Sequence, residues 1–242
     1  MIHIDINCDL GESFGAYTLG NDEAIMPFIT SANIACGFHA GDAGIMQSTI
    51  ALCKQYNVAV GAHPGFPDIQ GFGRRNMVYT PSEIYQMVLY QVGALFAFVK
   101  AAGTTLHHVK PHGALYNMAA KDKTMAKAIA QAVKDFDSTL YLYGLAGSLL
   151  IEEAQQIQLR TCSEIFADRT YLPDGSLTPR NQPGAMIHDA GKAVEQVLQF
   201  ITQKQVLAET VCIHGDGEKA VAFAQALQAN FQQHHISMQA PV

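Results

Sequence analysis

The chain has 242 residues, of which 49% are hydrophobic and 15% are charged, so it carries enough apolar material for one large α/β domain. Its net charge of −6 and its pI near 5.9 argue against a surface that binds nucleic acid or anionic lipid. No run approaches the roughly 18–20 apolar residues of a membrane helix. The start, "MIHIDINCDLGE", has acids where a signal peptide would be basic and then apolar. We therefore expect a single cytoplasmic domain over residues 1–242.

The five cysteines are odd in number and form no CxxC pair, which is typical of reduced structural thiols. Four of them lie in or beside apolar runs, where a thiol behaves as a small hydrophobe. Cys8 and Cys36 also lie near polar residues, so the alternative of a reactive thiol stays open.

Short β-rich runs alternate with helical patterns along the chain. The expected strands are residues 2–7, 31–36, 58–63, 107–112, 139–144, 159–166 and 210–216. The clearest helix begins with Thr80 as N-cap, Pro81 at the first helical position and Glu83 completing a capping box. Apolar residues at helical spacing predict further helices near 43–56 and 219–233.

Strict alternation of strands and helices predicts a parallel sheet. At this length the sheet either closes into a barrel or stays open and doubly wound. We expect a closed barrel, because polar residues follow the strands at one end only. The two longest loops, 64–80 and 167–187, are rich in Gly, Pro and Arg, which indicates lids or binding loops.

Polar and ionisable side chains follow six of the seven predicted strands. The carboxyl ends of parallel strands meet at one end of the fold, where sites are assembled, and a charge there needs a partner or a function. These residues are Asn7, Asp9, Glu12, His39, Asp42, His63, Lys110, His112, Glu164, Asp168, His214 and Asp216. They predict one barrel mouth lined by Asp9, His39, His63, Lys110, His112 and His214.

Each of these residues also has a structural interpretation. Asp42 and Asp216 each precede a helix, so either could be a simple N-cap. His63 or His112 alone is more often a hydrogen-bonded core histidine than a catalyst. Independent capping does not explain why acids, histidines and a lysine gather at one end of the sheet, whereas a polar pocket does.

Arg74 and Arg169 lie in the Gly/Pro-rich loops and could bind a carboxylate or phosphate, although solvated arginines are equally common there. The sequence contains no GxxxxGK[ST], GxGxxG, GxSxG or HExxH motif. Histidines and acids at strand ends could bind zinc, as in metal-dependent amide hydrolases, but none of the local zinc spacings occurs. No motif therefore indicates a nucleotide or a metal.

Several long blocks resemble the LamB/YcsF family, which supplies the A subunit of prokaryotic ATP-dependent 5-oxoprolinase. The blocks are "NCDLGESFG", "SANIACGFHAGD", "GAHPGFPD", "GFGRR", "HVKPHGALYN", "FADR", "DGSL" and "CIHGDG", and they run from residue 7 to 217. The resemblance implies an α/β fold, an irregular (β/α)7 TIM-like barrel of the glycoside hydrolase/deacetylase type. It also implies conversion of 5-oxo-L-proline to L-glutamate, driven by ATP, in a complex with the B and C subunits.

The resemblance does not assign the chemical steps, so the roles are our interpretation. A lactam is a poor electrophile that phosphorylation of its carbonyl oxygen would activate, and we expect ATP to be bound mainly by a partner subunit. Asp9 or Asp42 would activate water, histidines would move protons, and Lys110 would offset negative charge. The expected catalytic residues are Asp9, His39, Asp42, His63, Lys110, His112 and His214. The expected substrate-binding residues are Asn7, Glu12, Arg74, Glu164, Arg169 and Asp216.

Two rival functions stay open. One is a stand-alone metal-dependent amide or sugar deacetylase, in which Asp9, His39 and His63 would bind a divalent metal and a chelator would abolish activity. The other is a non-catalytic subunit that binds and presents the lactam, in which alanine at Asp9, Asp42 or His112 would leave the activity of the complex intact.

Overall fold

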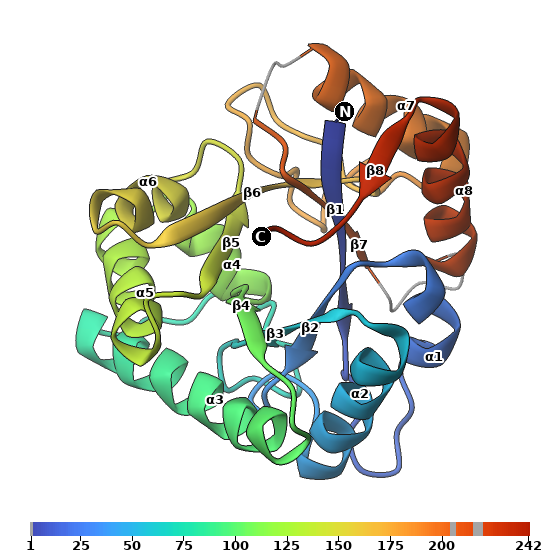
Figure 1. Ribbon diagram of the computed structural model, residues 1–242. Coiled ribbons are helices and arrows are strands. Elements are labelled where there is room, and N and C mark those ends of the chain that lie inside the picture. The colour runs from blue at the N-terminus through green and yellow to red at the C-terminus, as the bar shows by residue number, and fades with distance from the viewer. Residues whose placement is uncertain (1, 204–206, 215–219) are drawn as a thin grey trace.

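The computed structural model describes residues 2–203, 207–214 and 220–242 (Figure 1). Within them, seven parallel strands form a closed barrel, in which β7 and β2 both pair with β1. The strands are β1 (Ile2–Leu10), β2 (Ser31–Ala35), β3 (Ala59–His63), β4 (Leu106–Val109), β5 (Tyr141–Leu145), β6 (Arg160–Phe166) and β7 (Thr210–His214). The predicted closed barrel is confirmed, and the open doubly wound alternative is wrong.

A short eighth strand, β8 (Ile236–Met238), was not predicted. It pairs in parallel with the first residues of β1, Ile2 to Ile4, and so lies outside the closed ring. Three residues are too few to show an alternating pattern, and only the pairing with β1 makes them a strand. The last helix ends just before it, at Gln233.

Helices surround the barrel (Figure 1). They are α1 (Asp22–Ile25), the 3₁₀ helix η1 (Met26–Phe28), α2 (Ala43–Tyr56), α3 (Pro81–Ala101), α4 (Gly113–Ala119), α5 (Lys123–Phe136), α6 (Leu149–Gln156), α7 (Ala190–Gln203) and α8 (Ala220–Gln233). The predicted capping box of α3 is confirmed: the Glu83 N–H donates to Thr80 Oγ1, and the Thr80 N–H donates to Glu83 Oε2.

Of the described helices, α3 is long and apolar enough to cross a membrane by length and composition. The sequence had led us to expect no such segment. One side of α3, which includes Ile84, Val88 and Leu95, is buried, and the helix contacts α5, β3 and β4. A helix that covers a barrel meets the same criteria, so α3 is weak support for a membrane location.

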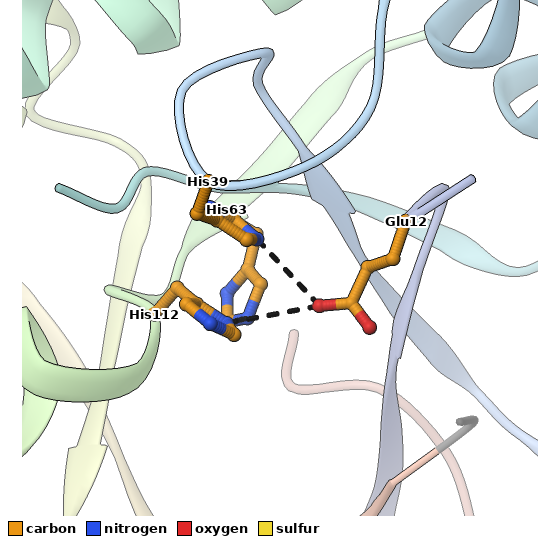
Figure 2. A group of neighbouring side chains, drawn as sticks. All are labelled: Glu12, His39, His63 and His112. Carbon is orange, nitrogen blue, oxygen red and sulfur yellow. Dashed lines mark hydrogen bonds and ion pairs between the residues drawn. The ribbon is translucent and has the colours of Figure 1, made fainter. Parts of the chain in front are cut away.

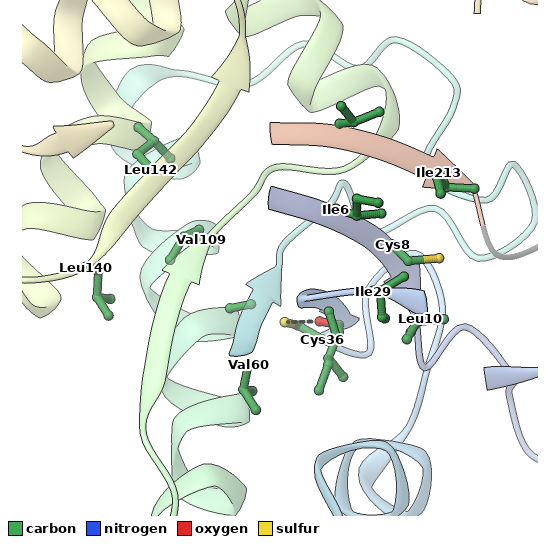
Figure 3. Close-up of a cluster of buried hydrophobic side chains, with 14 of the residues drawn as sticks. Ile6, Cys8, Leu10, Ile29, Cys36, Val60, Val109, Leu140, Leu142 and Ile213 are labelled. Carbon is green, nitrogen blue, oxygen red and sulfur yellow. Dashed lines mark hydrogen bonds between the residues drawn. The ribbon is translucent and has the colours of Figure 1, made fainter. Parts of the chain in front are cut away.

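The two faces of β1 differ in chemistry. Ile4, Ile6, Cys8 and Leu10 belong to the apolar core that the strands share with the surrounding helices (Figure 3). The residues between them are polar and bond across the inside of the barrel, so the apolar–polar alternation of "IHIDINCDL" matches an outer and an inner face. The barrel therefore has a polar interior, and its apolar core lies between the strands and the surrounding helices.

Asp5 joins several strands in this interior. Its carboxylate accepts hydrogen bonds from Ser31 on β2 (2.8 Å), Tyr143 on β5 (3.0 Å), Thr210 on β7 (2.6 Å) and Thr30 just before β2 (2.5 Å). Burial raises the pKa of Asp5 above its ordinary value, and the four hydroxyl donors act against that rise.

All five cysteines are buried and free. Burial is the main cause that raises the pKa of each of these thiols; for Cys36 and Cys53 the pKa reaches about 12. Their positions agree with the expected structural role, since a protonated buried thiol is a poor nucleophile.

Candidate active site

A cavity of about 1020 Å³ opens at the carboxyl ends of the strands. Asp9, Glu12, His63, Lys110 and His112 line its floor, which contains the ends of β1, β3 and β4 and the residues that follow them. Four arginines from the two long loops also line it: Arg74, Arg75, Arg169 and Arg180. The predicted mouth therefore has an acid–histidine–lysine floor and a basic rim.

Lys110 is the centre of the floor and is 2% exposed. Its Nζ lies 2.8 Å from Glu164 Oε1, 3.0 Å from Asn7 Oδ1, 3.1 Å from Asp9 Oδ1 and 3.1 Å from Cys212 Sγ. Burial acts to lower the pKa of Lys110, but the carboxylates of Asp9 and Glu164 outweigh it, so the pKa is raised well above its usual range. The ammonium group is therefore charged and held in place. We call these five residues the Lys110 network.

Amides and one hydroxyl complete the bonding of this network. Asn7 donates through Nδ2 to Glu164 Oε1 (2.8 Å), and Asn33 donates to Asn7 Oδ1 (2.7 Å) and Asp9 Oδ1 (2.8 Å). Tyr116 on α4 donates its hydroxyl to Glu164 Oε2 (2.6 Å). Asn33 and Tyr116 were not predicted; a polar residue in the middle of the apolar run "SANIAC" was the signal for Asn33.

The two carboxylate oxygens of Asp9 have different contacts. Its Oδ1 atom accepts from Lys110 and Asn33, whereas Oδ2 lies 3.3 Å from His63 Nε2. The side chain is buried but lines the cavity. A carboxylate that is anchored by one oxygen and contacts a histidine with the other is suited to accept a proton from a bound water.

Glu12, His39, His63 and His112 form a second group, which we call the Glu/His cluster (Figure 2). Their ligating atoms all lie within 4.8 Å of one another, and all four side chains are buried. Glu12 Oε1 lies 3.5 Å from His39 Nε2 and 3.7 Å from His112 Nδ1. Burial lowers the pKa of His39 and of His112 well below the usual range, and neighbouring histidines lower both further. Both rings are therefore neutral at pH 7.

Two glycines let His39 approach this cluster. A Cβ on Gly65 would lie 2.6 Å from His39 Nδ1, and one on Gly73 would lie 2.7 Å from His39 Cβ. Gly73 also has a positive φ of 62°, which a side chain would disfavour. The glycines in "HPGF" and "GFG" therefore allow the stacking of His39 on His112, whose ring centroids are 3.7 Å apart.

Asp42 lies apart from both groups. Its Oδ1 caps α2 by accepting from the Ile45 N–H (3.0 Å), and its Oδ2 accepts from the Gly15 N–H (2.9 Å). The backbone donors of Gly15 and Ile45 lower the pKa of Asp42. This position favours the capping role, and a catalytic role for Asp42 stays a prediction.

The other residues predicted for the site lie at the end of β7, beyond it, or on the rim of the cavity. His214 ends β7 in register with Asp9, but its side chain is outside the described part of the chain, and Asp216 is outside the described residues altogether. Arg169 is buried and donates to the carbonyl oxygens of Thr178 (2.6 Å) and Ala185 (3.4 Å). Burial, followed by the nearby charge of Arg180, lowers the pKa of Arg169 to about 10.

The other arginines of the rim differ in their surroundings. Arg74 is exposed and lies 4.8 Å from the centre of the Phe72 ring. Arg75 is paired with Asp68 within its own loop. Since Arg74, Arg169 and Arg180 all line the cavity, the rim attracts anions.

The closed barrel and its buried acid–histidine–lysine mouth define a β/α-barrel protein with an enzyme-like site. Its fold resembles the catalytic domain of a peptidoglycan N-acetylglucosamine deacetylase from Eubacterium rectale, with a TM-score of 0.54 and 13% identity over 99% of this chain and 88% of the other. The predicted deacetylase-type barrel is confirmed at the level of fold.

The chain belongs to the LamB/YcsF family, whose model matches residues 4–242. It is 58% identical to the A subunit of 5-oxoprolinase from Shouchella clausii, over 98% of both chains. It is also similar to the lactam utilization protein of Thermus thermophilus, with 45% identity and a TM-score of 0.93 over 99% of this chain and 100% of the other. The predicted family is confirmed.

Proposed function

We propose that this chain is the A subunit of an ATP-dependent 5-oxoprolinase and that its barrel mouth binds 5-oxo-L-proline. The observation that carries the proposal is the division of the cavity into a floor of acid, histidine and lysine and a rim of arginines. This division suits a small molecule with an amide to be cleaved at one end and a carboxylate at the other. The names of the relatives in Shouchella clausii and Thermus thermophilus support the same substrate class.

Phosphorylation explains why a lactam needs ATP. When the carbonyl oxygen takes the γ-phosphoryl group of ATP, ADP leaves and the ring carbon becomes electrophilic. Water then adds to that carbon, the C–N bond breaks to release the amine, and a second water hydrolyses the resulting acyl phosphate to glutamate and phosphate. The cavity, at about 1020 Å³, has room for a phosphoryl group beside the lactam.

The residues of the floor would divide this work. Asp9 Oδ2, beside His63, accepts the proton of the attacking water, and the charged Lys110 stabilises negative charge that develops above the floor. Arg74, Arg169 and Arg180 attract the substrate carboxylate and the phosphoryl group. Because the sequence lacks a P-loop, the B and C subunits supply the main ATP site.

The test is glutamate and ADP formation from 5-oxoproline, measured on this chain alone and on the complex assembled with its partner subunits. We expect negligible turnover by the isolated chain. In the complex, Asp9→Asn should reduce glutamate formation by about 100-fold or more, as loss of a general base does. Asp135→Asn, at an exposed position, is the matched control.

Two outcomes would contradict the proposal. Near-normal turnover by Asp9→Asn would make the chain a lactam-binding subunit without catalytic groups. Amide hydrolysis by the isolated chain without ATP would make it a stand-alone hydrolase. Asp42→Asn tests the second acid. Near-normal turnover would leave Asp42 a helix cap only, because asparagine caps a helix about as well as aspartate, whereas a loss of about tenfold or more would support its predicted catalytic role.

A further inference from the structure

We propose that Glu12, His39, His63 and His112 bind one divalent transition-metal ion of the Zn²⁺ type at the floor of the cavity. Three imidazoles and one carboxylate are the donors that Zn²⁺ and its neighbours prefer, whereas Mg²⁺ and Ca²⁺ prefer oxygen alone. The inference goes beyond the proposed lactam hydrolysis and does not depend on it, because binding can be measured on the isolated chain.

The hydrogen bonds of His63 and His112 fix where their protons lie. His63 Nδ1 lies 2.7 Å from the carbonyl oxygen of Lys110, and His112 Nε2 lies 2.8 Å from that of Phe72. A carbonyl oxygen only accepts, so each of these nitrogens carries the hydrogen. The other nitrogens of the two rings, His63 Nε2 and His112 Nδ1, face the cluster, and in this tautomer they are the nitrogens that can bind a metal ion.

These two nitrogens face each other. His63 Nε2 and His112 Nδ1 are 2.9 Å apart, which is hydrogen-bond distance, yet the hydrogen that the carbonyl contacts fix on each ring lies on its other nitrogen. Two lone pairs at this separation repel unless a positive species lies against both. A metal ion bound to both nitrogens, or a proton shared between them, would remove this repulsion. Backbone carbonyls on the far nitrogens are also the usual outer support of metal-binding imidazoles.

His39 decides between these two species. It is fully buried, and neither of its ring nitrogens has a hydrogen-bond partner among the described residues. Nδ1 is covered by Gly65, and Nε2 faces Glu12 Oε1 at 3.5 Å. A proton between His63 and His112 would leave the buried ring nitrogens of His39 unsatisfied, which is unfavourable. A metal ion bonded to Nε2 would satisfy it.

The dimensions of the cluster are close to those of a metal site. Zn²⁺ binds histidine nitrogen at about 2.0–2.1 Å and carboxylate oxygen at about 2.0–2.2 Å, so two ligand atoms on one ion lie at most about 4.4 Å apart. The four ligating atoms here lie within 4.8 Å of one another. Small side-chain rotations are enough to bring them onto one ion.

The position of the cluster connects it to the cavity. Glu12, His63 and His112 line the cavity, and Asp9 Oδ2 is 3.3 Å from His63 Nε2. The sequence had suggested Asp9, His39 and His63 as the alternative metal set. The structure instead supplies Glu12 as the carboxylate and adds His112, while Oδ1 of Asp9 is held by Lys110 and Asn33.

The test uses the full chain without a histidine tag, stripped with a chelator and titrated calorimetrically with Zn²⁺, and with Mg²⁺ for comparison. We expect one Zn²⁺ per chain and no comparable binding of Mg²⁺. Co²⁺ in place of Zn²⁺ should give the visible absorption of a site with histidine ligands. Loss of an outer partner of a metal ligand costs about 10–100-fold in affinity, so loss of a ligand should cost about 100-fold or more.

Glu12→Gln and His39→Gln are the variants to compare, with circular dichroism and melting temperature as checks on folding. His234→Gln, an exposed histidine far from the mouth in sequence, is the matched control and should bind Zn²⁺ as the unchanged chain does. The proposal is overturned if the unchanged chain binds no stoichiometric Zn²⁺. It is equally overturned if binding survives both cluster substitutions and is lost in His234→Gln, because the ion then lies on the surface.

Discussion

The ammonium group of Lys110 carries three N–H bonds, and four acceptors from β1, β6 and β7 lie within 3.1 Å of it. Every hydrogen of the group is therefore engaged inside the protein. Lys110 acts on a substrate through its charge and through the fixed position of Asp9, not by donating a hydrogen bond of its own. The pairing also explains how two carboxylates, Asp9 and Glu164, are tolerated in the barrel interior.

Removal of this charge should destabilise the fold. Lys110→Met would leave Asp9 and Glu164 buried without a counter-charge, and breaking a buried pair in this way costs about 3–5 kcal/mol. Urea unfolding measures the loss. Lys127→Met is the control, because Lys127 is 58% exposed and lies 3.7 Å from Glu153; its removal should cost less than about 1 kcal/mol. Equal losses in both variants would mean that the Lys110 network is not a buried ion pair.

The composition of the site was predictable from strand ends, but its pairings were not. Asp9 and His63 lie near the carboxyl ends of β1 and β3, Lys110 and His112 follow β4, and the structure brings all four to one cavity. The strand pattern could not separate Asp42 from Glu12, since both lie in loops after strands. Only the path of each loop turns Asp42 to backbone N–H groups and Glu12 to the histidines.

Among the elements, β1 connects several strands inside the barrel, because its polar side chains form hydrogen bonds with residues of β2, β5, β6 and β7. The alternation of apolar and polar residues predicted this strand, but it could not predict which residues of other strands its polar side chains would contact. The seven strands of the ring were predictable because each is bounded by helical patterns or by Gly and Pro. β8 was not, because its identity depends on a distant partner, Ile2 to Ile4.

The bonding of Asp5 to these strands predicts a dependence of stability on pH. Burial raises the pKa of Asp5 above 3.8, so the folded state binds this proton more tightly than the unfolded state. The contribution of Asp5 to the free energy of unfolding therefore falls as the pH rises through the interval between the two pKa values. Asp5→Asn resembles the protonated acid, so its stability relative to the unchanged chain should increase as the pH rises above the ordinary pKa of an aspartate, about 4.

Urea unfolding at several pH values measures this difference. Asp135→Asn, at an exposed position, is the control for the loss of one carboxylate. A constant difference between Asp5→Asn and the unchanged chain would mean that Asp5 has the same pKa in the folded and unfolded states.

Across the whole molecule, the apolar contacts and the polar groups occupy different places. Apolar side chains pack between the strands and helices (Figure 3), whereas the polar network lies inside the ring and the cavity at its carboxyl end. The hydrophobic pattern predicts the first of these, since it needs only the correct periodicity. The second depends on contacts between residues up to 205 positions apart, such as Thr210 with Asp5, which no local pattern encodes.

The reactivity of the five buried thiols can be used to measure how often the parts of the fold around them open transiently. Only a thiolate that solvent reaches can attack an aromatic disulfide reagent and release its aromatic thiolate, so each cysteine should react at the rate at which its surroundings open. We expect five equivalents to react at once in concentrated urea and less than about one over the same minutes in native buffer. Fast release of one equivalent in native buffer would contradict this and would show that the surroundings of one thiol open readily. If the modified cysteines are identified in order, that order ranks the parts of the fold by how readily they open.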